Sequence, residues 1–430
     1  MLVVSAEPVG DRMAGPAIRA LELARALARG GCAVTLAAPG AAPVEGVARL
    51  AAGLEDYDAL LGAARRHDVV VAQALPPRLL TRVAGLPARL VVDLYNPTVV
   101  EVLEATRTKA PGSRARQRAT VQGSAAAHLA AADLVLCASE RQRDLWLGAM
   151  ALRGLLDADG QAITVVPFGI PAEAPRADGR LRARFGVDPG ARVLVWGGGI
   201  WDWLDAPTAV RAMAHLPDDV HLVFLGAIRP AMAQRDVHRA GAGAVRVARE
   251  LGLEGKRVHF NADWVPYAER GGWLADADAG VSAHPDHLET RFAFRTRILD
   301  FLWAGLPVVT TRGDVLGDRV GREGLGVAVA AGDPRAFARA VGTVLADPAP
   351  YRERVLATAP SLTWDRAAAP LLDHVRTGAK RAPSPARSRT LRAATRAQYP
   401  AIAGEALATD GPAFLARKLG RNLARAAQRR

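Results

Sequence analysis

The 430-residue sequence contains few cysteines and no long apolar run. Its two cysteines, Cys32 and Cys137, have no second thiol or histidine nearby at metal-ligand spacing. This argues against a disulfide framework or a cysteine-based zinc site and favours the reduced, buried thiols of a cytosolic protein. No apolar run reaches the roughly 18 residues that a membrane-spanning helix needs. The chain opens directly on the strand-like Leu2–Val4 without a basic leader, so we expect no signal peptide and a cytoplasmic location.

Acidic residues are scarce mainly at the C-terminal end. The segment 376–430 has 13 Lys and Arg against 2 Asp and Glu, which is +11 of the net charge of +13. The rest of the chain is nearly neutral and the segment has few aromatics, so we expect no nucleic-acid partner. Residues 379–430 are predicted to form a flexible basic tail with an amphipathic helix over Pro412–Arg430. Such a tail suits an anionic membrane surface, at the inner face of the membrane, or is a solvated terminus that aids solubility.

Short, continuous apolar runs alternate with helical patterns along both halves of the chain. Strands that are buried on both faces of a parallel sheet have this appearance. The runs are Leu2–Val4, Ala33–Ala38, Val69–Ala72, Arg89–Leu94, Leu134–Ala138 and Thr164–Phe168, then Arg192–Gly197, His221–Gly226, Val258–Phe260, Ala279–Ala283, Val308–Thr311 and Gly326–Ala331. The sequence therefore predicts an α/β protein with two doubly wound, Rossmann-like domains, 1–172 and 173–378, facing a cleft. A ligand is expected in that cleft, at the carboxyl ends of the strands.

The segment from His284 to Thr311 combines an acid with several cations directly after a predicted strand. Glu289 is followed by Arg291, Arg295 and Arg297, and Asp300 lies in the helical pattern that ends at Ala-Gly-Leu-Pro. A carboxylate accepts hydrogen bonds from hydroxyls, and guanidinium groups bind phosphate oxygens in pairs. This combination suits a sugar attached to a diphosphate.

The same segment resembles the donor-site segment of family 4 retaining glycosyltransferases, which have the GT-B fold. Three further stretches support the resemblance, which covers most of 1–376: GDRMAGPAIR (10–19), ADLVLCASE (132–140) and VVPFGIP (165–171). The resemblance implies a nucleotide diphosphate sugar as donor, a glycan or lipid-linked acceptor in envelope or polysaccharide biosynthesis, and neither a metal nor another cofactor. It also implies transfer without a protein nucleophile, because the departing diphosphate can take the acceptor's proton while the protein supplies positioning and charge.

The resemblance also suggests roles for individual residues. It places the donor diphosphate near Gly15 and Arg19 of the first domain and near the Gly-rich loop of the second, and the base near the loop 261–272. The donor residues expected are Gly15, Arg19, Gly198, Gly199, Trp264, Val265, Arg291, Arg295, Arg297 and Asp300, and the catalytic residues are Glu289 and Asp93. Within this set Glu289 would contact the sugar, Asp300 the ribose hydroxyls, and Asp93 the sugar or the acceptor hydroxyl. Asp93 is equally consistent with a turn cap.

The chain departs from the family's pattern at two places. Where the family usually has an arginine and a lysine after the Gly-rich loop, this sequence has Ile200–Trp203. This departure either shifts phosphate binding to the arginines after Glu289 or implies a different acceptor geometry. Glu289 also lies three residues earlier than the family's spacing from Asp300 requires, which indicates a longer loop. Asp276 and Asp278 have the spacing of a Mg²⁺ site, but they lie at the turn into a strand, where structural acids are common.

The sequence is therefore interpreted as a retaining glycosyltransferase. Two alternatives remain open at this point. A nucleotide-sugar epimerase or a sugar phosphorylase can use the same two-domain fold, although no additional acid/base pair stands out. A non-catalytic nucleotide-sugar-binding protein is the other, since the expected Arg and Lys are missing.

Overall fold

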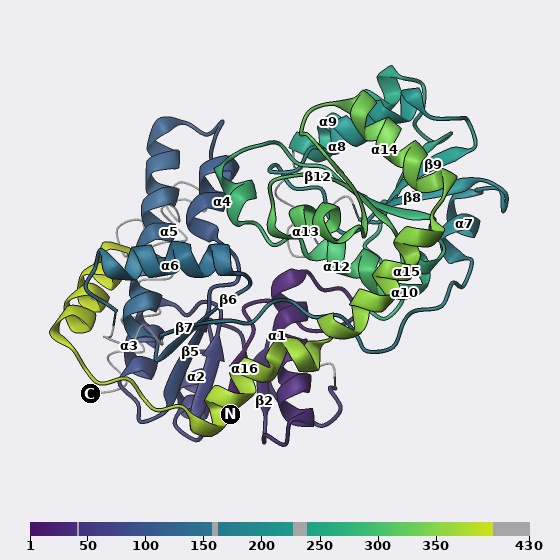
Figure 1. Ribbon diagram of the computed structural model, residues 1–430. Coiled ribbons are helices and arrows are strands. Elements are labelled where there is room, and N and C mark those ends of the chain that lie inside the picture. The colour runs from purple at the N-terminus through teal and green to yellow at the C-terminus, as the bar shows by residue number, and fades with distance from the viewer. Residues whose placement is uncertain (41–42, 157–161, 227–238, 399–430) are drawn as a thin grey trace.

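The computed structural model describes residues 1–40, 43–156, 162–226 and 239–398 and shows two α/β lobes (Figure 1). Each lobe contains one sheet, and every strand pairing in the two sheets is parallel. Helices connect most of the successive strands, although none is described between β2 and β3. The predicted pair of doubly wound domains is confirmed.

The first sheet has the strand order β3-β2-β1-β4-β5-β6-β7, so the order reverses between β1 and β4. All of these strands except β3 were predicted from the apolar runs, with ends within three residues. The exception is an edge strand with two exposed residues out of four, so it has no apolar signal. The strands are β1 (Leu2–Val4), β2 (Thr35–Ala38), β3 (Ala48–Ala51), β4 (Val69–Ala72), β5 (Arg89–Asp93), β6 (Leu134–Cys137) and β7 (Ile163–Val165).

The helices of the first lobe are α1 (Gly15–Arg29), α2 (Tyr57–Ala64), α3 (Pro77–Ala84), α4 (Thr98–Ala105), α5 (Pro111–Ala131) and α6 (Glu140–Ala151). In α1, Pro16 occupies the first turn, where its missing N–H leaves no hydrogen bond unmade. The side chains of Leu21, Leu23 and Leu27 are buried in the core of this lobe. This burial fixes the N-terminus of α1 at the carboxyl end of β1.

The second sheet has the strand order β10-β9-β8-β11-β12-β13, so the order reverses between β8 and β11. Its strands are β8 (Arg192–Trp196), β9 (Val220–Phe224), β10 (Val258–Phe260), β11 (Ala279–Ser282), β12 (Val308–Thr311) and β13 (Gly326–Val329). The α-helices that follow the first lobe are α7 (Arg180–Phe185), α8 (Ala206–Ala212), α9 (Arg239–Glu250), α10 (Arg270–Ala275), α11 (Leu288–Phe292), α12 (Thr296–Trp303), α13 (Val315–Glu323), α14 (Pro334–Ala346), α15 (Ala349–Thr358) and α16 (Trp364–Thr377), with short 3-10 turns at Met213–His215 and Ala359–Leu362.

A glycine in β11 determines how close α12 comes to the second sheet. A Cβ atom at Gly280 would overlap the ring of Phe301, which is fully buried on α12. Only glycine therefore lets this helix lie directly on the strand. The close packing brings Arg297 and Asp300, on the same helix, to the carboxyl edge of the sheet.

The helix α16 lies on the first lobe, although residues up to 378 were predicted to belong to the second domain. The backbones of Ile170 and Thr363 pair side by side as the chain leaves the first lobe and returns to it. The helix then packs along α1, with Leu372 against Gly30. Figure 1 shows α16 beside α1 at the base of the first lobe.

The first part of the predicted flexible tail is folded. Residues 385–398 form a helix whose Ala394 is buried in the core of the first lobe. The Arg387 guanidinium donates hydrogen bonds to the carbonyls of Ala130, Ala131 and Ala132, which end α5. Since these carbonyls lack partners within their own helix, the cation stabilises the helix end. The predicted amphipathic helix, 412–430, lies outside the described residues.

Candidate functional site

Two glycine-containing loops face each other where the lobes meet. One carries Gly15, at the start of α1, and the other is Gly197–Gly199, which follows β8. Gly198 has a φ of +69°, a conformation that favours glycine and lets the loop turn sharply. A cavity of about 130 Å³ lies between the loops. The larger side chains on its wall are Met13, Ile18, Phe168, Trp201, Trp264, Arg270, Arg297, Leu299, Asp300 and Trp364.

Arg297 provides a buried cation on this wall. Its side chain is 9% exposed, its Nη2 donates to the carbonyl of Gly199 at 2.9 Å, and its guanidinium lies 4.9 Å from the ring centre of Trp196. Its Nη1 is buried and has no hydrogen-bond partner in the described part of the chain. Burial, reinforced by Arg295, lowers the pKa of Arg297 to about 9. A buried cation with a free donor at the edge of a cavity is a site prepared for an anion.

Asp300 lies beside Arg297 on the same wall. The Nε of Arg270 approaches an Asp300 carboxylate oxygen at 3.5 Å. Burial raises the pKa of Asp300, and the neighbouring Arg270 and Arg297 oppose that rise. The carboxylate therefore lies between two guanidinium groups, and the three side chains together carry a net positive charge.

Arg270 is part of the site but was not predicted from the sequence. It is the only cation in the loop 261–272, which the resemblance associates with the base, and this feature could have identified it. Its Nη1 donates to the carbonyl of Tyr267 at 3.0 Å. Its guanidinium lies 3.8 Å from the ring centre of Tyr267 and 4.6 Å from that of Trp303.

Aromatic side chains form the remaining wall of the cavity. The rings of Trp201 and Trp203 stack at 5.5 Å, and the Trp264 indole donates to the carbonyl of Met13 in the opposite lobe at 3.2 Å. Trp264 therefore links the lobes as well as lining the cavity. Val265, the other residue predicted to lie near the base, lines an adjoining cavity that shares Asp300 and Arg270 with the first.

Arg19 and Asp93 form a buried ion pair inside the first lobe and do not line this cavity. Nε and Nη2 of Arg19 donate to the two carboxylate oxygens of Asp93 at 2.6 and 2.8 Å. The remaining donors of Arg19 reach the carbonyls of Pro167 and Val166. Arg19 is 0% and Asp93 3% exposed, so each side chain is fully engaged by the protein. The geometry supports a structural role for both residues in place of the predicted ligand contacts.

Glu289 and Arg295 form a second buried pair, also with two hydrogen bonds, at 2.9 and 2.6 Å. Glu289 is 1% exposed and does not line the central cavity. It faces Glu101 of α4 in the opposite lobe, since α11 contacts α4. Burial, together with the charge of Glu289, raises the pKa of Glu101 to about 8. No sequence signal pointed to Glu101, which lies in α4, away from any strand end.

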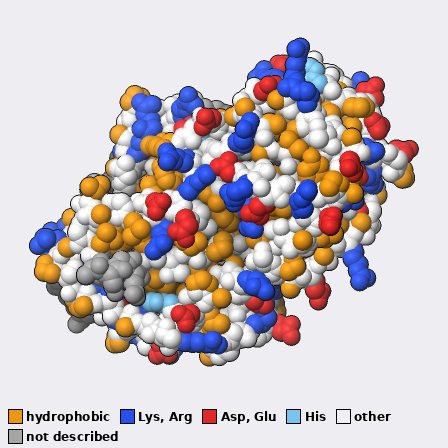
Figure 2. All heavy atoms as spheres, in the orientation of Figure 1, with side chains coloured by type: hydrophobic (Ala, Val, Ile, Leu, Met, Phe, Trp, Pro, Cys, Tyr) orange, Lys and Arg blue, Asp and Glu red, His pale blue; other side chains and the backbone are white. Residues whose placement is uncertain are grey.

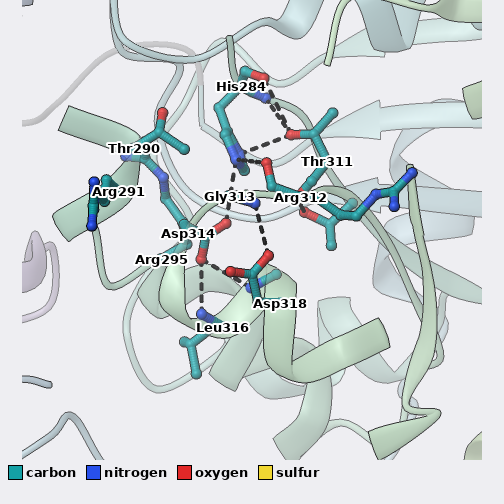
Figure 3. A network of polar contacts seen from close by, with 12 residues as sticks. His284, Thr290, Arg291, Arg295, Thr311, Arg312, Gly313, Asp314, Leu316 and Asp318 are labelled. Atoms are coloured by element: carbon teal, nitrogen blue, oxygen red, sulfur yellow. Dashed lines mark hydrogen bonds and ion pairs between the residues drawn. The ribbon is translucent and has the colours of Figure 1, made fainter. Parts of the chain in front are cut away.

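A network around His284 supports the loop that carries Glu289 (Figure 3). The buried imidazole contacts the hydroxyl of Thr311 at 2.9 Å, and its Nε2 lies 3.4 Å from an oxygen of Asp314. Asp314 in turn accepts hydrogen bonds from the backbone N–H groups of Leu316 and Gly317 and caps α13. Burial lowers the pKa of His284 to about 2 and raises that of Asp314 to about 6. The imidazole is therefore neutral at physiological pH.

Arg291, the remaining predicted cation, is exposed beside the contact between the lobes. Arg141 of α6 crosses to the second lobe, where it donates to the carbonyl of Gly313 at 2.8 Å and pairs with Asp318 at 2.6 Å. Gln142 donates to the carbonyl of Phe292 at 3.0 Å. Figure 2 shows basic and acidic side chains mixed along the region where the lobes meet.

The structure thus divides the predicted site residues into three groups. Those that line the two adjoining cavities are Gly15, Gly198, Gly199, Trp264, Val265, Arg297 and Asp300. Those that are occupied in buried ion pairs are Arg19, Asp93, Glu289 and Arg295, and Arg291 is exposed.

The acids with Mg²⁺-like spacing have structural partners. Asp276 accepts from the backbone N–H groups of Gly179 and Leu181, and Asp278 accepts from the N–H of Val193. Across the described residues, no three or more His, Cys, Asp or Glu side chains are grouped as a metal site. Nor does the described part of the chain contain a helix with the length and apolar character needed to cross a bilayer.

Comparison with known proteins gives matches in sequence and in fold. Residues 203–347 match the family model described as "Glycosyl transferases group 1". A D-inositol 3-phosphate glycosyltransferase of Xylanimonas cellulosilytica is 31% identical over 273 residues. The alignment spans 59% of this chain and 59% of that relative.

The solved structures that resemble this chain cover more of it at lower identity. Sucrose-phosphate synthase from Thermosynechococcus elongatus has a TM-score of 0.63 and 19% identity, over 87% of this chain and 98% of that one. HepE of Anabaena in complex with UDP-glucose has a TM-score of 0.61 and 14% identity, over 87% and 98%. WaaG, a glycosyltransferase involved in lipopolysaccharide biosynthesis, has a TM-score of 0.59 and 16% identity, over 86% and 99%. The chain has the two-domain GT-B architecture of these glycosyltransferases, and residues 203–347 are similar in sequence to glycosyl transferases group 1.

Proposed function

We propose that the protein is a retaining glycosyltransferase that moves a sugar from a nucleotide diphosphate sugar to an acceptor hydroxyl. The observation that carries the proposal is Arg297, whose buried guanidinium belongs to the wall of the cavity between two glycine-containing loops and whose Nη1 lacks a hydrogen-bond partner among the described residues. A diphosphate at this position would satisfy the free donor and neutralise the buried charge. The matches to glycosyltransferases in sequence and fold support the same assignment.

The donor would bind across the two carboxyl edges of the sheets. Backbone N–H groups of Gly198 and Gly199 can approach the diphosphate closely, and Asp300 can accept hydrogen bonds from the ribose hydroxyls. Trp264 and Val265 lie where the base would extend. The cavity is smaller than the roughly 300–1,000 Å³ of typical ligand sites. A whole nucleotide sugar would therefore need more room than this cavity offers, which the adjoining cavity and a separation of the lobes would supply.

The chemistry follows from positioning and charge. Arg297 would stabilise the negative charge that develops on the diphosphate as the bond to the sugar breaks. The departing phosphate would take the proton of the acceptor hydroxyl on the same face, so no protein nucleophile is needed. The Glu289–Arg295 pair would orient the loop beside the sugar. The protein would need neither a metal nor another cofactor for this reaction.

The proposed acceptor is a lipid-linked or other glycan precursor of the cell envelope. The protein would bind it in the cytoplasm, at the inner face of the membrane. The basic charge of residues 379–430 motivates this part of the proposal, because anionic lipids attract such segments. A non-catalytic nucleotide-sugar-binding protein is the second candidate. It is favoured by Ile200–Trp203 in place of the usual cations and by the complete pairing of Glu289.

The first test is a screen for release of nucleoside diphosphate from UDP-, GDP- and dTDP-sugars without added metal, with UDP-glucose first. Arg297→Gln should weaken binding of the matching nucleoside diphosphate about 10- to 100-fold, since a hydrogen bond to a charged group contributes about 1.5–3 kcal/mol. Arg246→Gln is a suitable control because Arg246 pairs with Glu250 on the exposed face of α9. Binding without turnover, even with acceptors present, would favour the second candidate. No binding of any nucleoside diphosphate would overturn both.

A further inference from the structure

Where the family that this sequence resembles usually has an arginine and a lysine, this chain has neither. Residues 200–203 are Ile, Trp, Asp and Trp, and the two tryptophan rings stack on one another. A diphosphate carries more negative charge than Arg297 alone can neutralise. A second cation must come from another element if the site is to hold a diphosphate firmly.

Most of the other arginines near the cleft are excluded by their contacts. Arg19 is fully engaged by Asp93 and two carbonyls, and Arg295 is paired with Glu289. Arg291 is exposed, and Arg141 is bound to Asp318 across the lobes. None of these four lines the central cavity. Arg270 does, and it also lines the adjoining cavity that contains Val265.

We propose that Arg270 is the second phosphate-binding residue of this site and replaces the missing cation after the Gly-rich loop. Its contact with Asp300 is 3.5 Å long, at the limit of a hydrogen bond, and is therefore weak. Its Nη2 has no hydrogen-bond partner within the described ranges. The guanidinium thus has a free donor and a loosely held one beside the cavity.

The rings of Tyr267 and Trp303 fix the plane of the Arg270 guanidinium. Apart from the long contact to Asp300, only its Nη1 is used in a hydrogen bond with the described residues, to the Tyr267 carbonyl. Tyr267 lies 3.8 Å from the guanidinium and Trp303 4.6 Å, so cation–π contacts hold the group in place. A diphosphate would be a stronger partner than the long contact to Asp300. Transfer of Arg270 from the carboxylate to the phosphate would free Asp300 to accept hydrogen bonds from the ribose. One cation would then couple phosphate binding to ribose recognition.

This inference rests on the proposed function, and its test separates the two. The wild-type protein, Arg270→Gln, Arg270→Lys and the Arg246→Gln control are titrated with the nucleoside diphosphate found in the donor screen and with its nucleoside. Calorimetry measures the diphosphate at several salt concentrations, and ligand-observed NMR measures the weaker nucleoside. If the wild type binds no diphosphate, the proposed function fails before this inference is reached.

Arg270→Gln should weaken diphosphate binding about 10- to 100-fold, flatten its salt dependence, and leave nucleoside binding nearly unchanged. Arg270→Lys keeps the charge without the planar fork, so its affinity for the diphosphate should lie between those of the wild type and Arg270→Gln. Equal losses for diphosphate and nucleoside would show that Arg270 only holds Asp300, and unchanged diphosphate binding would remove it from the site. Either result overturns the inference while Arg297 and the proposed function stand. If Arg270→Gln does not fold, wild-type affinity in Arg270→Lys would overturn it equally, because a stacked, forked guanidinium is required.

Discussion

Breaking the Arg19–Asp93 pair should destabilise the first lobe far more than removing both charges together. The pair is bidentate and almost fully buried, and Arg19 also satisfies two backbone carbonyls. Arg19→Met would leave a carboxylate buried without a partner, which typically costs about 3–5 kcal/mol in free energy of unfolding. The two carbonyls would add to that cost. Asp93→Leu leaves the converse, a buried guanidinium, and should cost a similar amount.

The double variant, Arg19→Met with Asp93→Leu, contains no uncompensated charge. Its main loss is the carbonyl hydrogen bonds, each worth about 1–3 kcal/mol when left unmade. The sum of the losses in free energy of unfolding of the two single variants should therefore exceed the loss of the double variant by at least about 2 kcal/mol. Native-state hydrogen exchange in β1, β4 and β5 reports the free energy of opening of this lobe without requiring the whole chain to unfold in one step.

Additive losses in that cycle would refute the interpretation of a coupled, structural pair. Turnover supplies a second criterion, because Asp93 was predicted to contact the sugar or the acceptor. At a temperature where the double variant is folded, a structural pair predicts kcat within about tenfold of the wild-type value, or roughly 1.4 kcal/mol in activation free energy. Loss of turnover in a stable, folded double variant would restore the catalytic prediction for Asp93.

The fold raises the pKa of Glu101 to about 8, so the wild-type protein loses stability as this carboxyl ionises with rising pH. The Tm of Glu101→Gln minus that of the wild type should therefore grow from about pH 5 to about pH 9. A Tm difference that does not change with pH would contradict this. Gly280→Ala should lower stability by at least about 1–3 kcal/mol and weaken donor binding by displacing α12. Gly342→Ala is its control, since a Cβ there meets no atom within 4 Å, and it should leave Tm equal or higher. Arg387→Ala should speed hydrogen exchange in the helix 385–398, and unchanged exchange would show that the contact of Arg387 with the end of α5 does not hold this helix in place.

The fold was largely predictable because a parallel sheet leaves a direct trace in sequence. A strand buried on both faces, such as Val69–Ala72, is apolar at every position and shows as a continuous run. The edge strand Ala48–Ala51 has no such requirement and was missed. The position of α16 was not predictable either, since its apolar face fits a helix on either lobe.

The candidate site was predictable only where backbone geometry decides it. Gly15 and Gly198 follow strands at the points where the sheet order reverses, and both lie on the cavity. Charged side chains were not predictable in the same way. Arg19 and Asp93 are 74 residues apart, and nothing in the sequence shows that they neutralise each other. A list of charges identifies possible ligand contacts, but only the fold shows which charges are already paired.

The return of α16 to the first lobe has a consequence for synthesis on the ribosome. Trp364, Ala368 and Leu371 are buried in the same core as α1, so the first lobe is completed by a segment made about 200 residues after its last strand. At about 5–20 residues per second, the first lobe would lack this helix for roughly 10–40 s after its last strand has been made. A nascent chain of this protein would therefore expose an apolar surface to chaperones during that time. A fragment that ends near residue 172 would lack α16 and would not reproduce the core of the first lobe.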